Sequence, residues 1–532
     1  MKSNVTRDLH ALIHSMTQHE KRYFRLYAGF SGKRRSNNYL DLFDDLHGMK
    51  EYSDEVLKKK VAGKSFEKSL PSTVHHLFSL VLKSLKSYRS EAKVGEEVRS
   101  LLASASLLRE RALYGAAMRL VRRARRRAER HEAWAELVEA LRMERGLMFH
   151  LKPKALYDEV EESTAMALDS LSKLDTELHL EALQDRHLAL RLRRMDPRWG
   201  DQVAALSNLM GSPFLSGTAP TWFRAAATYH SIHGNDALVK RDHEAAYSHL
   251  SECARLWESD ALRLKESPGD YLRCLSDLLN ACLYSMRWFE AERVLGRIAK
   301  IPIRTAEQES LLINQTLYMA LILYLNSGRY KEGAAAIQRI ENLLGKPHVQ
   351  VPVGRQLTYF YNITIFHFIR EDYRESLRWL NRILQFQASD LKQHLRDFAR
   401  IFQLVLHFEL GNLDLVEYLF RSAYRHYRTR KSLYRFEQLV FAAIRKMVHG
   451  EESQTEIASE LYKELWDEAR TLKGKEPAGM YELIFWAQGK SEGRPLQAVF
   501  QKRVDERMAL VEAKESGLDG DALRALEDRE LR

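Results

Sequence analysis

The stretch LLINQTLYMALILYLNSGRYKEGAAAIQRIENLL, residues 311–344, contains the pattern that decides the fold of this chain. Before its midpoint, Leu317, Leu321 and Tyr324 recur at the spacing of one helix face. Gly328 then interrupts the pattern, and helical spacing resumes directly after it. The stretch therefore predicts two helices that meet at one tight turn.

Small or apolar residues mark the same place in further units along the chain. These marker residues are Ala117, Val160, Val203, Ala246, Ala291, Gly333, Ser376, Val416 and Ala458. The intervals between them run from 40 to 45 residues, with a mean of about 43. A fixed period of this length predicts an α-solenoid, in which each helical hairpin buries its apolar face against its neighbours. Because Gly333 has no side chain, we expect two backbones to approach closely there.

Three neighbouring units show the pattern with different residues: AERVLGRI at 291–298, EDYRESLRWLNRI at 371–383 and GNLDLVEYLFRSA at 411–423. A turn residue, an aromatic residue, a small residue and two apolar residues follow at fixed offsets. This frame resembles that of the tetratricopeptide-repeat superfamily over roughly residues 95–470. Tetratricopeptide units have about 34 residues, so the longer units of this chain are similar to those of the superfamily's long-period relatives. The resemblance implies an all-α, right-handed superhelix of about nine hairpins.

The period divides the chain into three predicted parts. Residues 1–93 are expected to form a helical capping subdomain, 94–470 the solenoid, and 471–532 a C-terminal helical cap with a charged tail. Thr17 and Glu20 have the spacing of a capping box and predict a helix start.

The segment MTQHEKRYFRLYAGF at residues 16–30, with LKSLKSY at 82–88, resembles the opening of a family of uncharacterised bacterial tetratricopeptide-like proteins. That resemblance implies no activity. The first residues contain no apolar targeting segment, and the longest apolar run, which starts at Met319, is too short to cross a membrane. We therefore expect a cytoplasmic protein without a membrane partner.

The sequence contains no complete catalytic, cofactor-binding or metal-binding motif. No nucleophile elbow, dinucleotide fingerprint or kinase signature is present, so we expect neither an enzyme nor a bound cofactor. His230, His233 and His243 lie close to Asp236 in the sequence, but ordinary surface histidines are the favoured interpretation.

The three cysteines, Cys253, Cys274 and Cys282, cannot all pair with one another. Cys253 and Cys282 fall at positions of the frame that face the hairpin interior. Reduced core thiols are therefore expected.

The chain carries a net charge of +11, and its arginines cluster. The segment RLVRRARRRAER, residues 119–130, predicts a helix with Val121, Ala124 and Ala128 on its packed side and arginines on its polar side. The six arginines of this candidate patch are Arg119, Arg122, Arg123, Arg126, Arg127 and Arg130. Guanidinium groups pair with phosphates and carboxylates, so the patch is either a solvated face or a site for phosphates or an acidic partner.

A second basic segment, FRSAYRHYRTRKSLYRFE at residues 420–437, alternates arginines with aromatic residues. Aromatic side chains beside arginines can stack on unpaired bases. In a repeat frame the same aromatic residues are expected to pack between hairpins. Nucleic-acid binding or transcription regulation through the arginine-rich helices is therefore kept as the alternative function.

The leading prediction is a non-catalytic scaffold or adaptor that binds a protein or peptide on the concave face of the superhelix. The side chains expected there are Asn280, Tyr284, Gln315, Tyr318, Tyr361 and Asn362. Tyr318 and Ile322 stand where the superfamily's carboxylate clamp needs lysine and asparagine, so a chaperone-tail ligand is disfavoured. Packing between repeats is the competing interpretation of the tyrosines.

Overall fold

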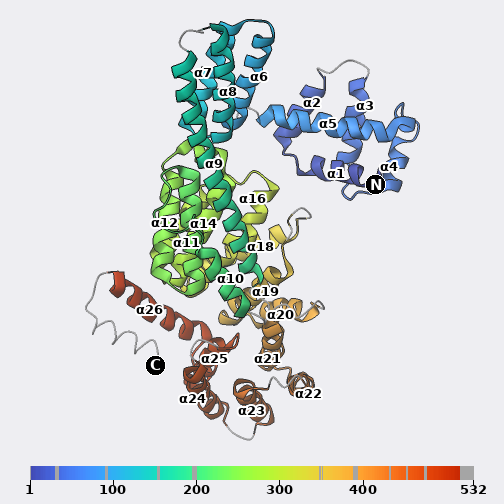
Figure 1. The fold of residues 1–532 in the computed structure, drawn as a ribbon. Coiled ribbons are helices and arrows are strands. Elements are labelled where there is room, and N and C mark those ends of the chain that lie inside the picture. Colours follow the sequence, from blue (N-terminus) through green and yellow to red (C-terminus); the bar gives the residue numbers. More distant parts are fainter. Residues whose placement is uncertain are drawn as a thin grey trace. The chain divides into compact units, whose positions relative to one another are not determined.

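The regular structure of the described residues is entirely helical (Figure 1). The computed structural model describes residues 2–29, 35–89, 94–151, 156–193, 200–346, 349, 351–386, 393–429, 433–450, 453–472 and 476–515. Within these ranges no strand occurs, which confirms the predicted all-α class.

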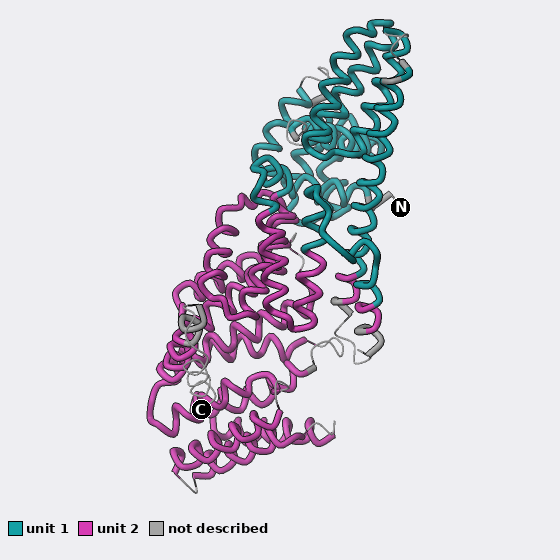
Figure 2. The backbone as a smooth tube through the Cα atoms, turned by 60° about the vertical axis from the view of Figure 1, so that its left-hand side comes forward, with its two compact units in different colours: residues 1–186, 208–230, 256–267 teal, residues 187–207, 231–255, 268–532 magenta. Residues whose placement is uncertain are grey.

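The chain forms two compact units (Figure 2). Unit 1 comprises Met1–Arg186, Asn208–His230 and Leu256–Ser267, and unit 2 comprises His187–Ser207, Ser231–Arg255 and Pro268–Arg532. Among the described helices, none has the length and apolar composition needed to span a bilayer.

The N-terminal helices of unit 1 pack around a common core. They are α1 (Lys2–Ser15), α2 (Gln18–Gly29), α3 (Arg35–His47), α4 (Asp54–Val61), the short 3-10 turn Glu67–Ser69, and α5 (Leu70–Arg89). Phe24, Phe43 and Leu77 are fully buried in that core. The predicted capping box is confirmed, since the Thr17 amide donates to Glu20 Oε2 at 2.8 Å and the Glu20 amide to Thr17 Oγ1 at 3.2 Å.

The next four helices include one that departs from the predicted hairpin series, α9. They are α6 (Val94–Glu110), α7 (Tyr114–Arg130), α8 (Trp134–Leu151) and α9 (Leu156–Arg193). Two units, marked by Val160 and Val203, are predicted here with a break between them, but α9 runs through the expected break as one helix of 38 residues. It contains neither glycine nor proline, so nothing in its sequence stops the helix. The side chain of Val203 lies outside the described residues.

From α10 onward the helices follow one another in short hairpins. They are α10 (Gly200–Met210), α11 (Phe223–Lys240), α12 (His243–Glu258), α13 (Ala261–Glu266), α14 (Pro268–Tyr284), α15 (Trp288–Ala299), α16 (Ala306–Leu311), the π-helical turn Leu312–Thr316, α17 (Leu317–Asn326), α18 (Tyr330–Leu344), α19 (Val353–Ile369), α20 (Tyr373–Gln385), α21 (Gln393–Glu409), α22 (Leu413–Thr429), α23 (Arg435–His449), α24 (Gln454–Leu472), α25 (Met480–Glu492) and α26 (Leu496–Glu515).

Most contacts between the helices of unit 2 join neighbours in this order. The two helices of a hairpin pack together in α14–α15, α17–α18, α19–α20 and α21–α22. The first helices of successive hairpins also touch, as in α14 with α17, α17 with α19, and α21 with α23. Such nearest-neighbour packing is typical of helical-repeat proteins.

Among the described residues, one turn geometry joins consecutive helices at eight places. In each turn a residue with positive φ lies one position before an amide that donates to a carbonyl five residues back, which is the Schellman hydrogen bond. The eight left-handed residues are Ala112, Glu132, Arg241, Met286, Gly328, Glu371, Gly411 and Gly493. Six of them stand five residues before a marker residue, namely all except Glu132 and Gly493. The sequence period is therefore realised as a repeated turn.

Seven of the nine marker residues are buried at the start of a second helix, whereas Val160, within α9, is only half-buried. Ala117, Ala246, Ala291 and Ser376 have no exposed surface. At Gly333, however, the close neighbour is a ring and not a second backbone, because a Cβ placed there would lie 2.6 Å from Cε2 of Phe366.

The three cysteines are buried free thiols, as predicted. Sγ of Cys274 donates to Sγ of Cys253 at 3.3 Å. This hydrogen bond, together with burial, raises the pKa of Cys274 well above its ordinary value.

Candidate functional site

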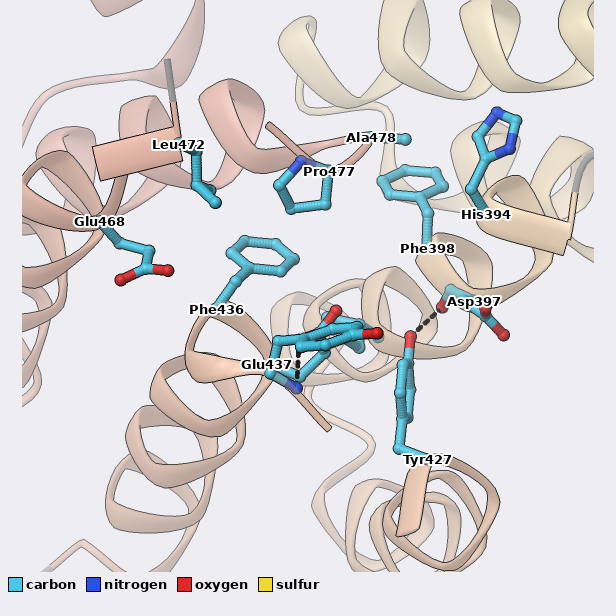
Figure 3. Close-up of a pocket in the computed structure, with 12 residues that line it drawn as sticks. His394, Asp397, Phe398, Tyr427, Phe436, Glu437, Glu468, Leu472, Pro477 and Ala478 are labelled. Atoms are coloured by element: carbon cyan, nitrogen blue, oxygen red, sulfur yellow. Dashed lines mark hydrogen bonds between the residues drawn. The ribbon is translucent and has the colours of Figure 1, made fainter. Parts of the chain in front are cut away.

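A cavity of about 360 Å³ lies within unit 2, between α21, α22, α23, α24 and the segment that leads into α25 (Figure 3). This volume falls in the range of small-molecule and side-chain pockets. The twelve lining residues come from five segments between residues 394 and 478, so the pocket depends on the packing of these hairpins.

Helix α21 forms one wall. His394, Asp397, Phe398 and Ile401 line the cavity, and their spacing places them on one face of that helix. The chain passes directly over the Phe398 ring, because a Cβ at Gly479 would lie 2.1 Å from its Cε2 atom. With φ of +82° at the same position, Gly479 meets both a steric and a conformational demand for glycine.

The opposite wall comes from α22 and the start of α23. The Tyr427 hydroxyl donates to the backbone carbonyl of Asp397 at 2.5 Å and ties α22 to α21. Phe436 and Tyr427 are almost fully buried, whereas Tyr434 is 67% exposed. Figure 3 shows Phe436 and Pro477 converging on the cavity with Leu472. The walls are therefore largely aromatic and aliphatic.

Three carboxylates line the pocket, those of Asp397, Glu437 and Glu468, and no lysine or arginine lines it. Glu437 is only 8% exposed, accepts the Tyr434 amide at 3.0 Å, and so closes the first turn of α23. Burial raises the pKa of the Glu437 carboxyl group above its ordinary value.

The other two carboxylates have basic neighbours outside the lining. His426 Nε2 lies 3.1 Å from Asp397 Oδ1, and Arg435 Nε lies 3.4 Å from Glu468 Oε2. Arg435 is largely exposed, so this second ion pair is weak.

The residues predicted for the concave face are brought together only in part. Tyr284, on α14, is 59% exposed and stacks on His243 with ring centroids 5.8 Å apart. Tyr318, on α17, has the Arg355 guanidinium 4.7 Å from its ring centre. Burial and then the nearby Tyr284 raise the pKa of Tyr318 above its ordinary value.

Tyr361 is covered by other parts of unit 2. Its hydroxyl donates to Glu482 Oε1 of α25 at 3.4 Å, and its ring meets Phe398 edge to face at 4.9 Å. Burial raises the pKa of Tyr361 well above its ordinary value. Tyr361 therefore packs within unit 2, as the competing interpretation of the tyrosines holds. Its contact with Phe398 places it behind the pocket wall.

The three predicted amide residues are half-buried. Asn362 donates to the Thr358 carbonyl of its own helix at 2.8 Å. Gln315 lies in the π-helical turn Leu312–Thr316, and Asn280 lies on α14.

The arginine patch on α7 has the predicted polarity, with Val121, Ala124 and Ala128 fully buried. Several of its arginines are paired within unit 1. Arg122 and the neighbouring Arg125 donate to the buried Glu144 at 3.1 and 3.0 Å.

The remaining arginines of the patch divide into two groups. Arg127 and Arg123 lie 3.1 and 3.8 Å from the carboxylate of Glu97. Arg119, Arg126 and Arg130 are exposed and form no ion pair with another described residue.

The three histidines near Asp236 in the sequence, expected to be ordinary surface residues, are half-buried instead. His233 stacks on His249 with ring centroids 5.1 Å apart. Asp236 is instead approached by Lys240 Nζ at 2.7 Å and His187 Nε2 at 3.8 Å. In the described part of the chain, no group of three or more histidine, cysteine and acidic side chains is placed to hold a metal ion.

Sequence reasoning missed the pocket, although one of its signals was visible. The alternating arginines and aromatic residues of segment 420–437 suggested a site for unpaired nucleic-acid bases. In the structure, Tyr427, Tyr434, Phe436 and Glu437 of this segment line the cavity. The partners from α21 and α24 are distant in sequence, and no local pattern connects them.

No protein-family model matches the chain, and no curated protein matches it either.

Proposed function

We propose that this chain is a non-catalytic adaptor that binds a segment of a partner protein, with the pocket between α21 and α24 as the anchor site. The observation that carries the proposal is the cavity of about 360 Å³ with aromatic and aliphatic walls. Interfaces gain most of their affinity from a few side chains that fill such pockets. Repeat proteins offer extended surfaces on which the flanking residues of a bound segment can lie.

The proposal includes an α-solenoid of tetratricopeptide-like hairpins as the scaffold. Two observations support it: the turns of one geometry at the period of the markers, and the contacts between successive first helices in unit 2. In such an array the pocket would be one of several contact points, with Tyr284 and Tyr318 as further ones on α14 and α17.

The test is an affinity capture with the full chain at near-physiological salt, in nuclease-treated and untreated halves. Ala478→Trp places an indole at the pocket edge, and Ala335→Trp makes the same change at an exposed site on α18. We expect a partner protein that survives nuclease treatment, binds the Ala335→Trp chain and is lost with Ala478→Trp. Retention by both variants would place the binding site elsewhere.

Nucleic-acid binding remains the second candidate, and the exposed Arg119, Arg126 and Arg130 favour it. Their combined change to glutamate would abolish retained nucleic acid, and retention by the native chain would fall steeply with salt. The pairing of Arg122 and Arg127 with carboxylates of the same chain weakens this candidate. Protein binding that is insensitive to nuclease would contradict it.

A further inference from the structure

The charge of the pocket is opposite to that of the whole chain. The chain carries +11, yet the cavity is lined by three acidic residues, one histidine and no lysine or arginine. A ligand group that enters it therefore meets negative charge at short range. This sign favours a cation and disfavours a carboxylate or a phosphate.

The walls suit the same kind of group. Phe398, Tyr427 and Phe436 supply aromatic rings around the cavity. Cations are attracted to the faces of such rings, and a guanidinium group also stacks on them. Leu472 and Pro477 offer aliphatic surface to the methylene stem of a long basic side chain.

Two of the carboxylates retain capacity for a ligand. A carboxylate has room for about four hydrogen bonds. The described contacts of the Glu437 side chain comprise the Tyr434 amide, and those of Glu468 comprise the exposed Arg435. A bound cation would also compensate for the burial that raises the pKa of Glu437.

The size of the cavity favours an organic group over a bare inorganic cation. Its volume of about 360 Å³ is that of a pocket for an organic group. No described cluster of ligands could hold a metal. The remaining match is a long side chain with a positive end and an apolar stem.

We propose that the pocket recognises an arginine or lysine side chain of an extended peptide, with the stem against Phe436, Leu472 and Pro477 and the charge near Glu437 and Glu468. This assignment rests on the proposed function and narrows it to a partner with a basic anchor residue. An acidic partner would instead bind the arginine patch on α7, which is a different site.

The experiment uses the immobilised full chain and pools of nine-residue peptides with one fixed residue at the centre. The fixed residues are arginine, its neutral analogue citrulline, lysine, its neutral analogue norleucine, and glutamate. We expect the arginine or lysine pool to be retained about tenfold or more above its neutral analogue. Glu437→Gln and Glu468→Gln should each reduce that preference, because both keep the shape and a hydrogen-bond acceptor while removing the charge.

The matched pair Ala478→Trp and Ala335→Trp separates the possible failures. Retention that requires an open pocket but shows no preference for the basic residue would overturn the basic anchor and leave the proposed function standing. The same conclusion would follow if neither glutamine variant changed the preference. Retention equal in the native and Ala478→Trp chains, including no retention by either, would overturn the pocket as the binding site.

Discussion

Gly333 offers a direct test of how successive hairpins pack. In most helix interiors, changing glycine to alanine stabilises the helix by about 0.5–1 kcal/mol. At Gly333 the new Cβ would lie 2.6 Å from Cε2 of Phe366, which is closer than carbon atoms tolerate. Phe366 is only 1% exposed, so its ring has no free space into which it can move.

The expected magnitude is the difference between these two effects. Overpacking of a close-packed core costs about 1–3 kcal/mol, so Gly333→Ala should destabilise α18 by about 1–2 kcal/mol. The matched control is Gly296→Ala on α15, where a Cβ meets nothing within 4 Å. It should stabilise its helix by up to about 1 kcal/mol. The two identical substitutions are therefore expected to have opposite signs.

Amide hydrogen exchange measured by mass spectrometry on the full chain follows each helix separately. Exchange in peptides from α18 should accelerate about five- to thirtyfold in Gly333→Ala, since about 1.4 kcal/mol corresponds to a factor of ten. Phe366→Leu replaces the ring with a smaller side chain, so the double variant Gly333→Ala/Phe366→Leu should lose most of the destabilisation that Gly333→Ala causes alone. Unchanged or slower exchange of α18 in Gly333→Ala would refute the packing described for these hairpins.

Three further outcomes are expected. Ala112→Gly should stabilise unit 1 by about 1 kcal/mol in thermal unfolding, because alanine occupies a left-handed turn position at φ of 57°; a loss of stability would contradict the turn geometry. Burial raises the pKa of Glu177 to about 7, so its contribution to stability is lost as pH rises from about 4.5 to 7. Glu177→Gln keeps an acceptor for the Trp134 indole. After allowance for solvent screening, this change should therefore stabilise the protein by about 1–2 kcal/mol at pH 8 and leave its stability nearly unchanged at pH 4.5. Equal effects at both pH values would contradict the burial of Glu177. Glu409→Ala removes the acceptor of the Trp486 indole at 2.6 Å, so limited proteolysis should release α25 faster than in the native chain, and an unchanged cleavage rate would show that this contact does not hold α25.

The sequence period predicted the local architecture because each hairpin carries its own signal. Small residues such as Ala291 and Ser376 recur where the second helix begins, and the structure buries them there. The turns were harder to identify. Gly328 is visible as a turn residue, but Met286 and Glu371 adopt the same left-handed conformation without any signal in their residue type.

The errors arise where long-range packing decides the structure. A period alone did not reveal that α9 continues through an expected break, since only the absence of glycine and proline marks it. Tyr361 fits the frame of an exposed first-helix residue, but α25, more than a hundred residues later, covers it. The pocket is the clearest case, because its walls from α21, α23 and α24 meet only in the folded unit.

The measurement that tests the central claim most directly is amide hydrogen exchange of the full chain with and without the partner recovered by affinity capture. The account predicts slower exchange on binding in residues 433–437 and 476–480, which border the pocket, and no such change in the Ala478→Trp chain. Protection confined to α7, or equal protection in both chains, would contradict the assignment of the pocket as the binding site.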